Sequence, residues 1–194
     1  MKFILGQKLE MSQIFNEKGE EIPVTLIEAG PCKVLQVKNK EKDGYEAVQL
    51  GFIKKTKNIK KTEKGKEFKY LKEFKNGKDL KLGQDIDLSI FKEGDKVRIS
   101  GLSKGKGFQG AVKRWGFKER GFAHGVKHES RTLGSIGCRY PQHVIKGRRM
   151  AGHMGFARIT VRNLKIAKID KENNILAVKG AVPGRRGTLL EIKE

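Results

Sequence analysis

Short apolar runs alternate with turn residues along both ends of the chain. The runs are rich in Val, Ile, Leu and Phe, a composition typical of strands, and clusters such as Asn16–Gly19 and Asp170–Asn174 supply turn chemistry between them. Many short strands punctuated in this way predict a mainly β fold whose sheet closes, or nearly closes, into a barrel. The predicted strands are Ile22–Ile27, Val34–Val37, Ala47–Ile53, Ile86–Phe91, Val97–Ile99, Ile159–Ile169, Ile175–Val178 and Leu189–Ile192.

The middle of the chain breaks this pattern. Apart from Phe108–Trp115, which could form a short helix, it sustains no period of 2 or 3.6 residues. Residues 101–162 hold 12 of the 24 glycines, and so glycine-rich a segment buries too little apolar surface to offset its ordering entropy. Because strands resume at Ile159, we predict a long loop that leaves the barrel and returns to it. The expected organisation is barrel over 1–101, loop extension over 102–158 and closing barrel strands over 159–194.

A lysine-rich stretch from Lys54 to Lys81 also interrupts the strand pattern. Its Phe68, Leu71 and Phe74 have the spacing of one helix face, and a strand around Leu71–Phe74 is equally compatible. We favour a solvated basic insertion over either element.

The charge balance points to a polyanionic partner. The chain of 194 residues has 43 Lys plus Arg against 22 Asp plus Glu, a net charge of +21. Residues 101–162 carry 14 basic residues and only two acidic ones, Glu119 and Glu129. No apolar run approaches the length of a membrane-spanning helix, so we expect no membrane partner and favour nucleic acid.

The segment Gly105–Gly110 matches the GxGxxG pattern of dinucleotide-binding loops. It follows a predicted strand and precedes a possible helix, as such a site requires. No second βαβ unit follows, however, and no acidic residue ends a strand about 20 positions later to bind a ribose. We therefore favour contact with RNA phosphate, assisted by Lys104 and Lys106 and by helix N-terminal amides.

The sequence gives little support for a metal site, for catalysis or for a disulfide. His124, His128, Cys138, His143 and His153 lie in glycine-rich sequence that offers no rigid frame for a tetrahedral metal site. Glu119 and Glu129 are the only acidic residues of the segment, and we do not expect them to divide the roles of catalytic acid and base. Cys32 and Cys138 show no paired spacing and are expected as reduced cytoplasmic thiols. We expect no enzyme activity, no cofactor, no metal and no small-molecule substrate.

Arginines and lysines are spread irregularly along the glycine-rich segment. A helix-turn-helix reader of DNA would place them on one helix face, whereas this distribution suits a chain threaded between RNA helices. The candidate RNA-binding residues are Lys104, Lys106, Lys113, Arg114, Trp115, Lys118, Arg120, His124, Lys127, His128, Arg131, Arg139, His143, Lys146, Arg148, Arg149, His153 and Arg158.

Several long motifs, spread in order over nearly the whole chain, are distinctive. The motifs are Gly6-Gln-Lys8, Met11-Ser-Gln-Ile-Phe15, Ile22-Pro-Val-Thr-Leu-Ile-Glu-Ala-Gly30, Ser103-Lys-Gly-Lys-Gly-Phe-Gln-Gly-Ala-Val-Lys-Arg-Trp115, Gly134-Ser-Ile-Gly137, Lys146-Gly-Arg-Arg-Met-Ala-Gly152, Met154-Gly155 and Val178-Lys-Gly-Ala-Val-Pro-Gly184. Together they closely resemble the motifs of the bacterial large-subunit ribosomal protein L-three family.

This resemblance implies a barrel of the type found in translation proteins and a loop that reaches through large-subunit (23S-type) rRNA towards the peptidyl transferase centre. It also implies a cytoplasmic ribosomal protein that binds near the 3′ end of that rRNA, nucleates early assembly and touches the neighbouring large-subunit proteins fourteen and nineteen. The loop tip would fall around Gly137–His143. A glutamine that some relatives carry methylated is not matched, because Cys138 or Arg139 stands there.

Overall fold

The computed structural model describes residues 2–63, 65–75 and 80–194, which fall into two compact units. The first unit contains the chain up to Ser103 together with Arg158–Glu194, and the second is Lys104–Ala157. Strands dominate the first unit and helices are few and short. The mainly β class predicted from the sequence is confirmed.

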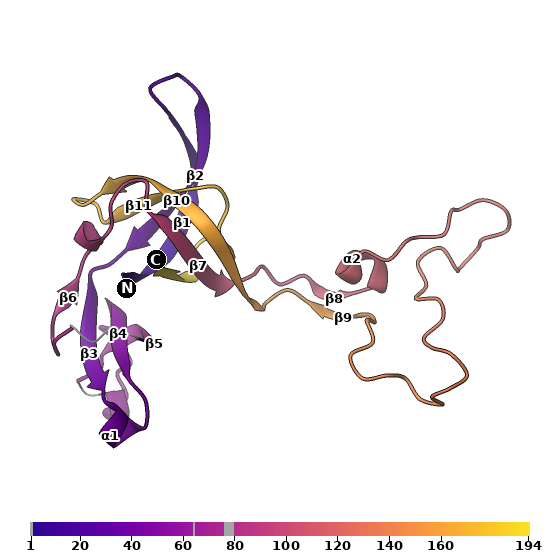
Figure 1. Ribbon diagram of the computed structural model, residues 1–194, viewed down its shortest axis with the longest axis horizontal. Helices are drawn as coiled ribbons and strands as arrows, with labels where there is room; N and C mark the ends of the chain where they lie inside the picture. The colour runs from indigo at the N-terminus through magenta and orange to yellow at the C-terminus, as the bar shows by residue number, and fades with distance from the viewer. Residues whose placement is uncertain (1, 64, 76–79) are drawn as a thin grey trace. The chain divides into compact units, whose positions relative to one another are not determined.

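Six antiparallel strands of the first unit close into a barrel (Figure 1). Each strand pairs with the next around the ring, and the first also pairs with the last. In order around the barrel the strands are β1 (Phe3–Phe15), β12 (Leu189–Lys193), β7 (Lys96–Leu102), β10 (Arg158–Asp170), β11 (Ile175–Lys179) and β2 (Glu21–Ala29).

The barrel interior is filled by large aliphatic side chains. Ile4, Ile99, Leu176 and Leu190 are completely buried, and each contributes about 1.5–3 kcal/mol by leaving water. Gly101 on β7 lies where a side chain could not fit, since a Cβ there would stand 2.7 Å from Cδ2 of Leu190. A close-packed interior of this kind makes the barrel a rigid frame, because cores at this density do not deform continuously.

A second, four-stranded sheet completes the first unit. Its strand order is β5 (Phe68–Phe74), β4 (Ala47–Lys54), β3 (Cys32–Lys38) and β6 (Asp85–Ile86). Phe74 of this sheet stacks on Phe3 of the barrel, with ring centroids 4.6 Å apart. Both rings belong to the one cluster of buried residues that spans the two sheets, so sheet and barrel share a core.

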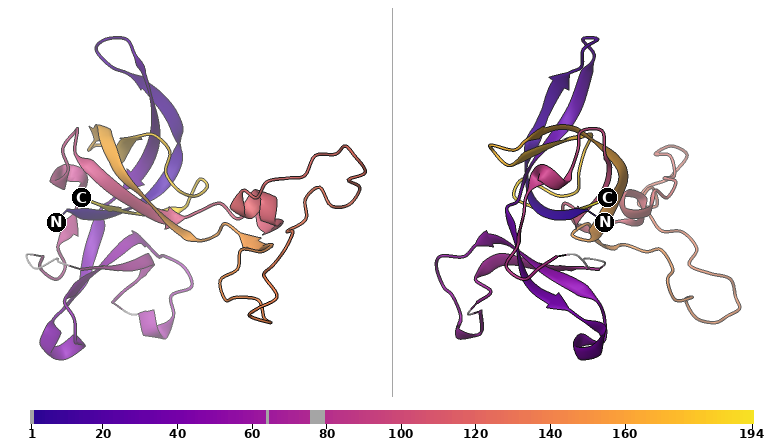
Figure 2. Two further views of the ribbon diagram at one scale, coloured as in Figure 1. Left: turned by 45° about the vertical axis from the view of Figure 1, so that its right-hand side comes forward. Right: turned by 60° about the vertical axis from the view of Figure 1, so that its left-hand side comes forward.

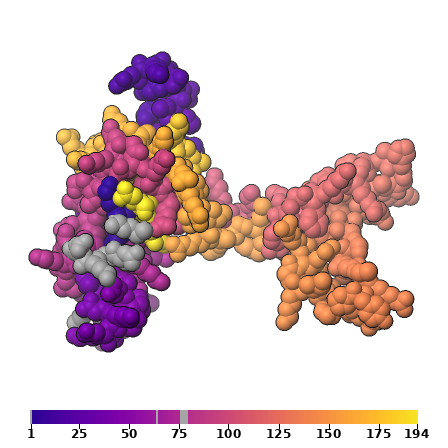
Figure 3. Space-filling model, viewed as in Figure 1, coloured from indigo at the N-terminus to yellow at the C-terminus, as the bar shows by residue number. Residues whose placement is uncertain are grey.

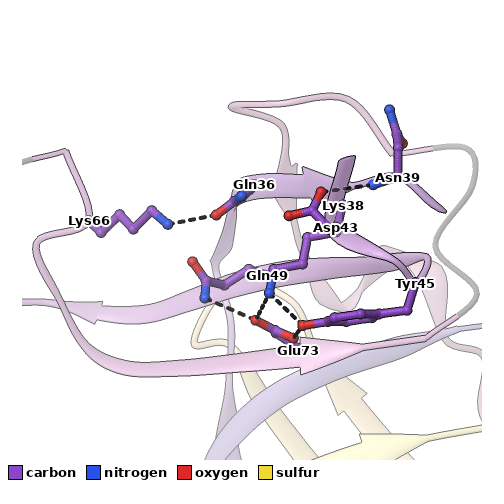
Figure 4. A network of polar contacts seen from close by, with 8 residues as sticks. All are labelled: Gln36, Lys38, Asn39, Asp43, Tyr45, Gln49, Lys66 and Glu73. Carbon is purple, nitrogen blue, oxygen red and sulfur yellow. Dashed lines mark hydrogen bonds and ion pairs between the residues drawn. The ribbon is translucent and has the colours of Figure 1, made fainter. Parts of the chain in front are cut away.

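The outer end of the second sheet carries a polar network (Figure 4). Glu73 of β5 accepts a hydrogen bond from the Tyr45 hydroxyl at 2.8 Å and pairs with Lys38 of β3 at 2.8 Å. Lys38 lies between the two, donating to the Tyr45 oxygen as well. A short helix, α1 (Lys40–Asp43), ends at Gly44 in the left-handed conformation and connects β3 to β4. The network therefore ties the β3–β4 connection to β5.

Two sequence predictions for the first unit were wrong. Phe68–Phe74 is a strand, although the basic stretch from Lys54 to Lys81 was expected to be a solvated loop. Phe74 of this strand is buried against the barrel. The sequence did not indicate this burial, because lysines flank the strand on both sides. Residues 64 and 76–79 of the stretch lie outside the described residues. Ile86–Phe91 is not a strand, because β6 ends at Ile86 and a 3₁₀ turn, η2 (Leu88–Ile90), follows. Another 3₁₀ turn, η1 (Lys61–Glu63), precedes β5.

Strands β1 and β2 continue as a hairpin that stands clear of the rest of the first unit (Figures 2 and 3). After a register shift between Lys8 and Met11, their pairing runs out to Phe15 opposite Glu21. The turn predicted over Asn16–Gly19 is present, with the Gly19 amide donating to the Asn16 carbonyl at 3.0 Å. Most side chains of this hairpin are exposed.

The second unit contains little regular structure. A two-stranded ribbon of β8 (Gly107–Gln109) and β9 (Gly152–Met154) forms its base, and α2 (Ala111–Trp115) follows β8. The helix expected over Phe108–Trp115 is thus confirmed only from Ala111, and Phe108 belongs to a strand. From Gly116 to Ala151, a stretch that the structure describes throughout, no helix or strand is present. No helix among the described residues is both long and apolar enough to span a bilayer.

Candidate nucleic-acid interface

The base of the second unit is held by a close backbone approach. Gly155, directly after β9, has a φ of +78°, and a Cβ there would fall onto the carbonyl oxygen of Lys104. The amide of Lys106 donates to the Met154 carbonyl at 2.9 Å across the same ribbon. Only glycine meets both requirements at position 155, because it tolerates positive φ and has no Cβ. The ribbon thereby fixes where the irregular segment begins and ends.

A cluster around Trp115 joins α2 to the chain that precedes β9. Nη1 of Arg114 and the indole Nε1 of Trp115 donate to the same carbonyl, that of Met150, at 2.8 and 2.9 Å. The guanidinium of Arg149 lies 5.5 Å from the centroid of the Trp115 ring and that of Arg114 lies 4.9 Å from it, within range for cation–π attraction. Gly152 leaves room for Arg114, because a Cβ there would lie 2.7 Å from Nη1. Two cations and an aromatic ring are thus presented together.

Both acidic residues of the second unit are paired with arginines. Arg120 contacts Glu129 at 2.5 Å, and Arg131 contacts Glu119. The Arg120 amide also donates to the Ser130 carbonyl at 3.1 Å, so the two pairs close one loop. The pairs are substantially exposed, and such surface ion pairs contribute only about 0–1 kcal/mol each. Their main effect is to neutralise the two carboxylates that would repel a polyanion.

The remaining cations of the second unit face solvent. Of the candidate residues, only Arg114 is half-buried and the others are exposed. Arg148 donates to the Ser135 carbonyl at 2.6 Å, and Arg139 lies 6.0 Å from the Tyr140 ring centroid. The candidates that make no side-chain hydrogen bond or ion pair with the described part of the chain are Lys104, Lys106, Lys113, Lys118, His124, Lys127, His128, His143, Lys146 and His153.

Unlike the other candidates, Arg158 belongs to the first unit. It begins β10 and pairs with the nearly buried Glu191 of β12. The two line a pocket of about 350 Å³ together with Arg98 and Lys193. Burial lowers the pKa of Lys193, and the positive charges of Arg158 and Arg98 lower it further, against the opposing effect of Glu191. Five cations and two carboxylates line this pocket, so it is basic on balance.

The GxGxxG segment does not have the geometry of a dinucleotide loop. Gly107 to Gln109 form strand β8 and pair with β9, so no open loop connects a strand to a helix there. Helix α2, which Gly110 precedes, has only five residues. The prediction that helix N-terminal amides bind phosphate here is therefore not supported. The segment instead presents two exposed lysines, Lys104 and Lys106, beside a two-stranded ribbon.

Exposed aromatic side chains are the feature that sequence reasoning missed. Phe108, Phe122, Tyr140 and Phe156 of the second unit have exposed fractions of 67–77%. Aromatic rings in a segment with no core to join are candidates for stacking on unpaired bases. The sequence signal was their placement among glycines and cations, where an aromatic residue has no apolar neighbours to pack against.

Comparison with known proteins decides the family. A family model described as ribosomal protein L3 matches residues 54–174. Large ribosomal subunit protein uL3 of Pelotomaculum thermopropionicum is 47% identical, over 100% of this chain and 96% of the relative. Its counterparts from Carboxydothermus hydrogenoformans and Finegoldia magna are 48% and 47% identical, over 100% of this chain and 97% and 98% of theirs. The chain belongs to the ribosomal protein L3 family.

Family membership confirms the resemblance found in the motifs. It makes this L3-family chain a structural protein of the large ribosomal subunit, located in the ribosome of the cytoplasm. The relatives are ribosomal proteins and not enzymes, so the prediction of no enzyme activity is confirmed as well.

Proposed function

We propose that this L3-family chain binds large-subunit rRNA through its second unit, residues 104–157, while the barrel anchors the chain in the subunit. One observation carries the proposal: within this unit, which is described throughout, Ala111 is the only buried residue. Packing within the unit cannot offset the entropy of ordering some fifty residues. A partner must supply the stabilisation, and the exposed charge determines its chemistry.

The charge of the unit favours a phosphate backbone over a protein surface. Residues 104–157 contain 12 arginines and lysines and two glutamates, and both glutamates are already paired with arginines. Phosphates that approach from several sides match cations distributed along an irregular path. Exposed rings such as Phe122 and Tyr140 add stacking on splayed bases, which sequence-tolerant RNA contacts commonly use.

The finer placement in the subunit is part of the proposal. The family resemblance supports a loop tip around Gly137–His143 directed towards the peptidyl transferase centre and binding near the 3′ end of the rRNA. It also supports a role in nucleating early assembly beside the large-subunit proteins fourteen and nineteen. With no acid–base pair in the unit, any effect on peptide-bond formation would act through RNA positioning.

The test separates charge from sequence. In one variant, residues 118–147 are replaced by a short Gly-Ser linker, which preserves the β8–β9 ribbon and the Trp115 cluster. In a matched variant, the same 30 residues keep their composition in scrambled order. We expect the deletion to remove high-affinity binding to an rRNA fragment without changing the thermal midpoint of the barrel. We expect the scrambled chain to bind RNA but to lose its preference for the rRNA fragment. Unchanged binding by the deletion variant would disprove the proposal.

A further inference from the structure

The β1–β2 hairpin exposes apolar side chains on both of its faces. Side chains alternate between the faces of a strand, so Met11, Gln13 and Phe15 share one face, and Ile14 points to the other. Met11 is 53% exposed and Phe15 is 66% exposed. On the opposite face Ile14 lies directly across from Ile22, and both are half-buried. Every residue from Met11 to Ile22 is exposed or half-buried, and Figure 3 shows the hairpin standing clear of the rest of the first unit.

A hairpin of this kind gains stability from being covered. A lone two-stranded ribbon is only marginally stable in water, and adjacent exposed apolar side chains commonly mark interaction sites. Two hydrogen bonds stiffen the turn: the Asn16 side-chain oxygen accepts from the amides of Lys18 and Glu20 at 3.0 and 2.8 Å. The ribbon is thus held in shape up to its tip, which suits a docking element.

The charge of the hairpin is opposite to that of the chain as a whole. Its residues 10–22 carry four glutamates and one lysine, a net charge of −3 in a chain of +21. Glu10 is paired with Arg186 at 2.5 Å. Glu17 and Glu21 make no side-chain hydrogen bond or ion pair with other described residues. The tip therefore repels phosphate and attracts cations.

We infer that this hairpin, residues 10–22, docks onto a basic protein surface with apolar groups at its centre, and not onto RNA. The inference rests on the chain working within the large subunit, where a surface element meets either rRNA or another protein. The carboxylates around Met11 and Phe15 disfavour RNA, because any base on which these side chains could pack is flanked by phosphates. Complementary charge at the rim and burial of aromatic and Met side chains at the centre are the usual anatomy of protein–protein contacts.

Photo-crosslinking in assembled large subunits tests this contact directly. Phe15→p-benzoyl-phenylalanine is incorporated in the full chain, subunits are purified, and crosslinked products are split by nuclease and by protease. We expect the Phe15 probe to attach to a subunit protein, at a segment rich in Lys and Arg. The matched probe, Phe122→p-benzoyl-phenylalanine in the second unit, should attach to rRNA. Attachment of the Phe15 probe to rRNA, or to nothing, would overturn the inference.

The two proposals fail in distinguishable ways. If both the Phe15 probe and the Phe122 probe crosslink to protein, the proposed rRNA contact of the second unit is wrong and the hairpin contact is supported. A charge test adds to this: Glu17→Lys with Glu21→Lys, in the chain with the Phe15 probe, should lower the protein crosslink about fivefold or more by placing like charges at the rim. An unchanged yield would contradict the stated chemistry of the partner. Both positions are exposed, so the barrel fold is not at risk.

Discussion

Three lysines of the second unit offer a quantitative test of phosphate contact. Lys118, Lys127 and Lys146 are exposed and lie in the stretch without helix or strand. They have no side-chain partner among the described residues, so replacing all three with Ala removes charge without breaking a contact. Each phosphate neutralised contributes about 0.7–0.9 to the slope of log K against log salt. If all three meet phosphate, the slope should become shallower by about 2–3.

That change in slope is large enough to measure. Between 50 and 200 mM salt, salt concentration changes fourfold, so the triple variant should lose about 20- to 40-fold less affinity than the parent chain over this range. The assay is equilibrium binding to a large-subunit rRNA fragment at four or more salt concentrations. Circular dichroism of the same samples should show an unchanged thermal midpoint, since none of the three side chains is buried.

A matched triple in the first unit distinguishes local contacts from overall charge. Lys42, Lys57 and Lys171 are also exposed, and their replacement by Ala lowers the net charge by the same amount. We expect this control to change the slope by less than about 1. Equal changes from the two triple variants would contradict phosphate contact by the second unit, because rRNA binding would then depend only on the net charge of the chain.

Three further predictions concern the architecture. Gly155→Ala places a Cβ on the Lys104 carbonyl; it should open the β8–β9 ribbon, seen as faster amide hydrogen exchange there, and weaken rRNA binding. Burial raises the pKa of the Cys32 thiol to about 12 while Cys138 is exposed, so a thiol reagent at pH 8 should modify one cysteine in the native chain and two after unfolding. A hydrogen bond from Lys38 lowers the pKa of Glu73. The stabilisation from this hydrogen bond is therefore complete above the unfolded pKa of about 4.3 and is lost as pH falls through the lower folded pKa. The melting temperature should therefore decrease as the pH drops below about 4.

Each of these predictions has a control. Gly147 has a φ of +81° but open space around its Cβ position, so Gly147→Ala should leave the ribbon closed, and equal effects would mean that strain and not the clash matters. Cys138→Ser should abolish native labelling; persistent labelling would show that Cys32 is accessible. Glu73→Gln should flatten the acid limb of the melting curve, and an unaltered limb would assign it to other carboxyls.

The strands that the sequence revealed are those with apolar residues on alternate or consecutive positions. The barrel strand β10 was predicted as Ile159–Ile169 and observed as Arg158–Asp170. Strand β1 was not predicted, because polar residues such as Gln7, Lys8 and Glu10 interrupt it. Lys8 is nonetheless buried, and its ammonium donates to the carbonyls of Val182 and Gly184 at 2.9 and 3.1 Å. No local pattern indicates that carbonyl groups some 170 residues away will solvate a lysine.

The division of strands between two sheets was also beyond the sequence. The apolar patterns of β3 and β4 resemble those of barrel strands, and only the pairing of Cys32 with Ile86 and of Gln49 with Glu73 places them in a separate sheet. Pairing partners depend on tertiary contacts at long sequence separation, which periodicity does not encode.

At the candidate interface, the distribution of charge could be read from the sequence, whereas the contacts between side chains could not. Frequent glycines and the lack of a 2- or 3.6-residue period predicted a loop, and the structure has no helix or strand from Gly116 to Ala151. The pairing of Arg120 and Arg131 with the two glutamates could not be predicted, because those residues are 9 and 12 positions apart on an irregular path. The same holds for the shared Met150 carbonyl that draws Arg114 and Trp115 together.

The measurement that tests the central claim most directly compares two RNAs. The full chain is titrated with a fragment from the 3′ part of the large-subunit rRNA and with an unrelated RNA of equal length, each from 50 to 200 mM salt. Contact with 6–10 phosphates predicts that affinity falls by roughly 10³–10⁵ over this range, and we expect this steep fall together with a clear preference for the rRNA fragment. A steep fall without preference would reduce the second unit to a generic polycation, and a shallow one would show that its cations do not meet phosphate.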